Sequence, residues 1–87
     1  MSLEQRFLEA VEKVKTLTQR PTDEELLELY ALFKQGNFGD NNTDKPGMFD
    51  VKGKYKWEFW MKKKGMTKEE AQEEYIKFVE TLLEKYA

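Results

Sequence analysis

Apolar residues recur along the first third of the chain at the spacing of an α-helix. Their steps alternate between four and three, which places them on one helix face; they are Leu3, Phe7, Ala10, Val14 and Leu17. Ser2 and Gln5 form a capping box in front of this stripe. A second box, Thr22 with Glu25, precedes an apolar run over residues 26–33. The pattern predicts two helices, the second of which ends at Gly36.

The chain from residue 36 to 46 is rich in Gly, Asn, Asp and Pro, which is typical of a long loop. Asp50 is the expected cap of a third helix that runs to about Lys63. A third capping box, Thr67 with Glu70, opens a fourth helix with the stripe Ala71, Tyr75, Val79, Leu82 and Tyr86. We therefore expect an all-α protein, a four-helix bundle. The long connection allows the second and third helices to run parallel.

The length and composition narrow the class of protein further. The 87 residues suit a single domain, residues 1–87, and contain no Cys and no His. No disulfide, thiolate nucleophile, imidazole base or ordinary zinc site can be built from this chain. The paired glutamates fall on exposed helix faces, where a carboxylate lacks the burial that raises the pKa of a general acid. We expect no catalytic residue and no metal site.

Charge is distributed unevenly along the chain. The net charge is −2, which suggests no bulk attraction to nucleic acid or membranes. Residues 45–68, however, hold eight lysines and two acids, a local charge of +6. This run fits either a solvated helix face or an anion site on an otherwise acidic protein.

The second helix carries more apolar surface than one stripe needs. Either it packs against neighbours on two sides, or part of its surface faces a ligand. Tyr30 and Lys34 lie side by side at i and i+4, either as a half-buried tyrosine beside a solvated lysine or as a pair aimed at a phosphate. Trp57 and Trp60, at i and i+3 in the third helix, are expected to fill the core.

Several of these segments together resemble the acyl-CoA-binding protein family. The residues that carry the resemblance are 21–35, 39–43, 46–48 and 52–57, with Trp60. Their order and spacing are specific, and the similarity spans essentially the whole chain. It implies a bundle with up-down-down-up topology, in which the long loop crosses between two parallel helices. It also implies a carrier and pool former for long-chain acyl-CoA esters that has no catalytic activity and needs no cofactor.

The resemblance also implies which residues bind the ligand. Tyr30, Lys34 and Lys56 would hold the 3′-phosphate of CoA, and residues 30–34 would form a floor for the adenine and the acyl chain. Phe33 stands where animal members commonly have tyrosine, so it keeps the ring and lacks the hydroxyl. The full expected set is Lys15, Tyr30, Ala31, Leu32, Phe33, Lys34, Lys56 and Tyr75.

An apolar groove for the acyl chain is expected beside the second helix. Leu26 and Leu27 on that helix, with Phe7, Ala10 and Val11 on the first, could supply it. The rival interpretation is a helical protein-interaction module that docks a partner through the second helix.

We expect a monomer in the cytoplasm that binds long-chain acyl-CoA and no nucleic acid. Transient contacts with membranes or with acyl-CoA-using enzymes would be compatible with such a carrier.

Overall fold

The computed structural model describes residues 1–87, which form four helices and no strand, as the sequence predicts. The helices are α1 (Leu3–Val14), α2 (Asp23–Phe38), α3 (Val51–Met61) and α4 (Lys68–Lys85). None of them has the combination of length and apolar character that crossing a membrane requires.

The starts of the helices are where the capping residues place them. In each of the three predicted capping boxes, the side chains of the first and fourth residues bond to one another's backbone N–H groups. Asp50 caps α3, since its Oδ1 accepts a hydrogen bond from the Gly53 amide at 3.0 Å. All four N-termini are therefore determined by residues within one turn of the start.

The helix ends differ from the prediction. α1 stops at Val14, so Leu17 packs against the core from the connection that follows. α3 stops at Met61 rather than Lys63. Gly36 does not end α2, which continues to Phe38 and is capped by Gly39 at φ 77°. Gly36 is instead a site of close approach, because a Cβ there would lie 3.2 Å from the buried Phe7 ring.

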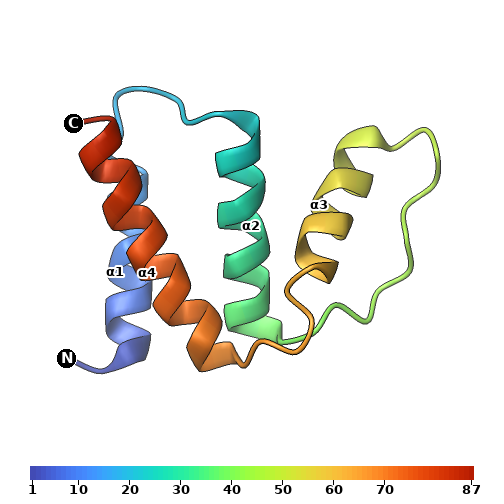
Figure 1. Cartoon of the computed structure of the whole chain (residues 1–87), viewed down its shortest axis with the longest axis horizontal. Coiled ribbons are helices and arrows are strands. Elements are labelled where there is room, and N and C mark those ends of the chain that lie inside the picture. Colours follow the sequence, from blue (N-terminus) through green and yellow to red (C-terminus); the bar gives the residue numbers. More distant parts are fainter.

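The helices are arranged in a flat molecule, 37 × 28 × 15 Å, with up-down-down-up topology (Figure 1). The chain rises through α1 and descends through α2; residues 39–50 then climb back, so that α3 also descends before α4 rises. The long loop thus joins two parallel helices.

The hydrophobic core lies between α1, α2 and α4. It is a cluster of eight buried residues: Phe7, Ala10, Leu29, Leu32, Tyr75, Ile76, Val79 and Leu82. α2 packs against α4 on one side and α3 on the other, whereas α3 packs against α2 alone. α2 is therefore the central helix, which accounts for its broad apolar surface.

The two tryptophans lie outside this cluster and bind the long loop. Trp60 is buried, and its indole donates to the Gly39 carbonyl oxygen at 2.9 Å. The Trp57 indole is half-buried and donates to the Thr43 carbonyl oxygen, also at 2.9 Å. The expectation that both fill the core is confirmed for Trp60, which is buried, and is wrong for Trp57, which is half-buried. Each indole N–H has its acceptor in the loop.

Candidate binding groove between α2 and α3

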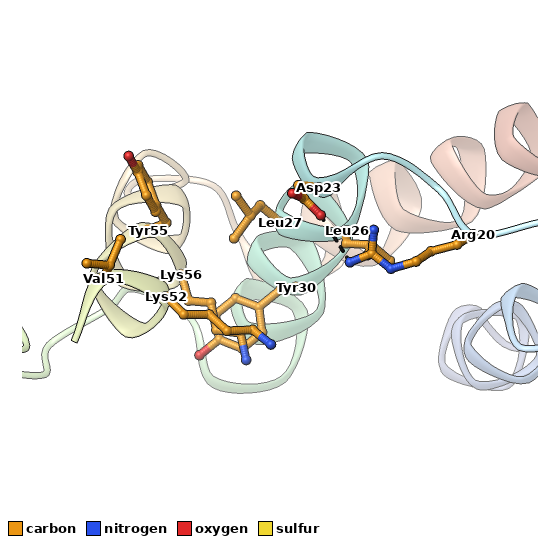
Figure 2. A pocket seen from close by; sticks show the side chains of 9 residues that line it. All are labelled: Arg20, Asp23, Leu26, Leu27, Tyr30, Val51, Lys52, Tyr55 and Lys56. Carbon is orange, nitrogen blue, oxygen red and sulfur yellow. Dashed lines mark ion pairs between the residues drawn. The ribbon is translucent and has the colours of Figure 1, made fainter.

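A groove of about 710 Å³ runs between α2 and α3 (Figure 2). α2 and the segment before it contribute one wall, and α3 contributes the other. Nine residues line it: Arg20, Asp23, Leu26, Leu27, Tyr30, Val51, Lys52, Tyr55 and Lys56. Its volume falls within the range of about 300–1,000 Å³ that is usual for small-molecule sites.

The groove has a polar part and an apolar part. Lys52 and Lys56 extend from α3 toward the ring of Tyr30, whereas Leu27 and Tyr55 lie together on another side of the opening (Figure 2). Lys52 and Lys56 share a side of α3 because they are four residues apart. Such a groove suits a ligand with an anionic end and an apolar end.

The first helix does not contribute to this groove. Phe7 and Ala10 are buried in the core against α4, and Val11 packs beside them, so none of the three faces the groove. Leu26 and Leu27 do line the groove, but the opposite wall is α3. The parallel course of α3 along α2 creates this wall.

Two cations converge on the ring of Tyr30. The Nζ atom of Lys56 lies 5.1 Å from the ring centroid, and that of Lys34 lies 5.7 Å from it. Neither lysine forms an ion pair with a carboxylate. Two uncompensated ammonium groups next to a phenol hydroxyl are well suited to bind a phosphate dianion.

Aromatic rings also surround Lys34 from other sides. Its Nζ atom lies 4.9 Å from the centroid of Phe38 and 5.6 Å from that of Trp60. Ring faces attract a cation without neutralising it, so they orient the ammonium group while leaving its charge available.

Comparison with known proteins shows the family to which this chain belongs. The family model described as "Acyl CoA binding protein" matches residues 4–79. The chain belongs to the acyl-CoA-binding protein family. It is 61% identical over 83 residues to the "Acyl-CoA-binding protein homolog" of Drosophila melanogaster, covering 95% of this chain and 96% of that protein. It is 48% identical to the "Acyl-CoA-binding protein" of Saccharomyces cerevisiae, covering 95% of both chains.

Solved structures of acyl-CoA-binding proteins share the fold. The crystal structure of Oryza sativa Acyl-CoA-Binding Protein 2 superimposes with a TM-score of 0.91 at 43% identity, over 95% of this chain and 90% of that one. The acyl-CoA-binding protein of Babesia bovis superimposes with a TM-score of 0.80 at 39% identity, over 99% and 98%.

Within the segment 30–34 expected from the family resemblance, the residues lie in different surroundings. Tyr30 lines the groove. Lys34 is not part of the lining, but its ammonium group lies next to the Tyr30 ring. Ala31 and Leu32 are buried and leave a ligand no side-chain surface. Phe33 is half-buried, with its ring centroid 6.0 Å from that of Phe7. The structure therefore groups Tyr30 and Lys34 with Lys56 and sets the intervening residues apart.

Tyr75 also lies apart from the groove. Its ring packs edge-on against Phe7 at 5.1 Å, and burial raises the pKa of its phenol to about 12. Its hydroxyl has no hydrogen-bond partner in the chain. Gln35 Oε1 is the only fully buried side-chain polar atom that lacks a partner, so the Tyr75 oxygen reaches the surface. Contact between this hydroxyl and a ligand stays a prediction.

Lys15, at the end of α1, also lies outside the groove lining. It is the C-terminal cap of α1, it is exposed, and its Nζ atom pairs with Glu12 at 2.9 Å. It is not part of the groove lining, so its contact with a ligand also stays a prediction.

The expected set omitted several groove residues. Arg20 and Asp23, which pair at 3.0 Å, lie at the start of α2. Val51, Lys52 and Tyr55 come from α3. The i, i+4 spacing of 51 with 55 and of 52 with 56 was the available signal, but it becomes informative only when α3 is known to face α2.

Proposed function

We propose that this chain binds long-chain fatty acyl-CoA esters and acts as a carrier and pool former, without a catalytic step of its own. Residues 1–87 would act as one acyl-CoA-binding domain. The observation that supports this most directly is the groove itself, in which unpaired lysines and Tyr30 adjoin apolar side chains of α2 and α3. Membership of the acyl-CoA-binding protein family supports the same ligand.

The polar part of the groove would bind the phosphates of CoA. Lys34 and Lys56, with the hydroxyl of Tyr30, would hold the 3′-phosphate through charge-assisted hydrogen bonds. Lys52 extends toward the same ring and could bind a second phosphate oxygen. Because these lysines have no carboxylate partners, no existing ion pair has to break when the ligand binds.

The apolar part would take the acyl chain. Leu26, Leu27 and Val51, with the ring of Tyr55, provide apolar surface on both walls. Each buried methylene group adds roughly 0.8 kcal/mol, so a longer chain strengthens binding as long as the groove covers it. This dependence supports a preference for long-chain esters.

Calorimetry with three ligands tests the proposal. Long-chain acyl-CoA is expected to bind with nanomolar to micromolar affinity, CoA more weakly, and the free fatty acid hardly at all. The order follows because CoA keeps the phosphate contacts and loses the chain, whereas the fatty acid keeps only the chain. Equal affinity for the fatty acid and the acyl-CoA would contradict a site built on the phosphates.

The rival proposal, a protein-interaction module that docks a partner on α2, has less support. α3 and α4 already cover two sides of α2, which leaves the groove as its main open apolar surface. Native mass spectrometry of the freshly purified protein distinguishes the two proposed functions. An acyl-CoA adduct is expected for a carrier, whereas an interaction module would carry none.

A further inference from the structure

Large apolar side chains on the surface gather at one place in this molecule. Seven are exposed in the whole chain, and four of these lie between residues 48 and 55. Phe49 is 94% exposed and Met48 77%, while Val51 and Tyr55 are more than half exposed. A contiguous apolar patch on a small protein often marks an interaction site.

The patch begins at a tight turn. The Asp50 amide donates to the Gly47 carbonyl oxygen at 3.0 Å, which makes Met48 and Phe49 the central residues of the turn. Such positions usually hold Gly, Asn, Asp, Ser or Pro. The turn lies at the start of α3, on the outer edge of the molecule (Figure 1). The two side chains therefore stand on a projecting feature and not in a hollow.

Cations surround this turn. Residues 45–56 contain four lysines (Lys45, Lys52, Lys54 and Lys56) and one acid, Asp50, which gives the segment a net charge of +3 in a protein of net −2. None of the four lysines pairs with a carboxylate. The Asp50 carboxylate caps α3 through the Gly53 amide and forms no ion pair with any of them.

The structure assigns this surface, Met48, Phe49, Val51 and Tyr55 with the surrounding lysines, to docking on an anionic lipid bilayer. Projecting apolar side chains can enter the boundary between headgroups and acyl chains, and the lysines are attracted to anionic headgroups. A folded protein partner would need a matching hollow for a projecting Phe and Met. Each attraction is weak alone, and the two together give reversible binding.

The lipid surface is continuous with the groove. Val51 and Tyr55 belong to the exposed patch and also line the groove wall. A bilayer that contacts Met48 and Phe49 would lie beside the opening between α2 and α3. This part of the inference rests on the proposed function: an acyl chain could then pass between membrane and groove with little exposure to water.

Sedimentation with sucrose-loaded vesicles tests the inference. The intact protein is mixed with vesicles of phosphatidylcholine alone or of phosphatidylcholine with phosphatidylserine. The wild type is expected to sediment with the anionic vesicles, less with the neutral ones, and less still as salt is added. Replacing Met48 and Phe49 together by Ser is expected to lower the partition coefficient about tenfold or more.

The control is Leu8→Ser, which removes a 54% exposed apolar side chain from α1, away from the patch, and is expected to change partitioning less than twofold. A second test combines Lys45→Gln with Lys54→Gln, which should reduce the preference for anionic vesicles. Lys13→Gln with Lys77→Gln, which removes the same charge from α1 and α4, should leave that preference unchanged.

Three results would overturn the inference. The first is a wild type that does not bind anionic vesicles, as expected of a surface that docks a protein. The second is a loss of vesicle binding in Leu8→Ser equal to that in the Met48/Phe49 variant. The third is a loss of CoA affinity in the Met48/Phe49 variant, measured without vesicles. The last would place these two residues in the ligand site. A failure of the proposed function is distinguishable, because acyl-CoA binding would then be absent from vesicle-free calorimetry while the wild type still sedimented with vesicles.

Discussion

Tyr30 shows how one side chain can organise an anion site. Its ring lies within 6 Å of two ammonium groups, from Lys34 of its own helix and Lys56 of α3. The ring attracts both cations, and no carboxylate competes for either. Two neighbouring positive charges repel one another, so a bound phosphate would relieve this repulsion as well as form hydrogen bonds.

Removing either lysine tests this arrangement. Lys34→Ala and Lys56→Ala are each expected to weaken acyl-CoA binding by about 1–3 kcal/mol, the range for a lost charge-assisted contact. Titration calorimetry measures the change, and Lys77→Ala on the exposed face of α4 is the control for charge alone. Unchanged affinity in both groove variants would mean that the lysines form only a solvated face.

Between elements, α2 makes a close contact with α1 and α4 at Gly36, which has no side chain. At Gly36, a Cβ would lie 3.1 Å from Cγ of Gln72 on α4 and 3.2 Å from Cζ of Phe7 on α1. Gln72 also donates from Nε2 to the Gly36 carbonyl oxygen at 2.9 Å. Three helices therefore meet at a position that only glycine fills without displacing a neighbour.

Gly36→Ala is expected to destabilise the protein by about 1–2 kcal/mol. A helical alanine normally gains up to about 1 kcal/mol over glycine, but the fully buried Phe7 ring cannot move aside without cost. Urea unfolding measures the change. Gly47→Ala, where a Cβ meets nothing within 4 Å, is the matched control and should be neutral. A stabilised Gly36→Ala would show that the helices can separate freely.

Across the whole molecule, the C-terminal end of α4 is held to the start of α2. Lys85 Nζ donates to Glu25 Oε2 at 2.8 Å, and the Tyr86 hydroxyl donates to Glu25 Oε1. These hydrogen bonds lower the pKa of Glu25 from 4.5 to about 2, and the bond from Lys85 has the largest effect. The contact joins residues that are 60 positions apart and closes the bundle at one end.

This lowered pKa predicts an acid-sensitive contribution to stability. A carboxylate whose pKa is lower in the folded than in the unfolded state stabilises the fold above pH 4.5. This stabilisation is lost as the pH falls from 4.5 to about 2. In Glu25→Gln, which keeps the capping-box chemistry, the loss of stability relative to wild type should be full at pH 6 and shrink toward pH 2. Thermal melts at several pH values measure it, and a gap that is independent of pH would contradict the assignment.

The local chemistry of the sequence determined the elements. A capping box involves residues three apart, and an apolar stripe repeats within one turn, so the starts of the helices and their buried faces follow without knowledge of the fold. Thr22, Asp50 and Thr67 all cap where expected. The specific motif around Lys34 and Lys56 identified the family before any geometry was known, and the structure brings those two lysines together at Tyr30.

Only the tertiary structure decided which surfaces face one another. Glycine often ends a helix, which is what the sequence predicts for Gly36. Its neighbours Phe7 and Gln72 come from other helices, so its role as a site of close helix packing depends on the fold. The spacing of the two tryptophans predicts an apolar contact, but their acceptors, the carbonyl oxygens of Gly39 and Thr43, lie in a loop that only the fold brings beside them. Helical periodicity assigns a side chain to a face and leaves the neighbour of that face undetermined. For this reason the second wall of the groove depends on the long loop, which returns the chain so that α3 runs parallel to α2.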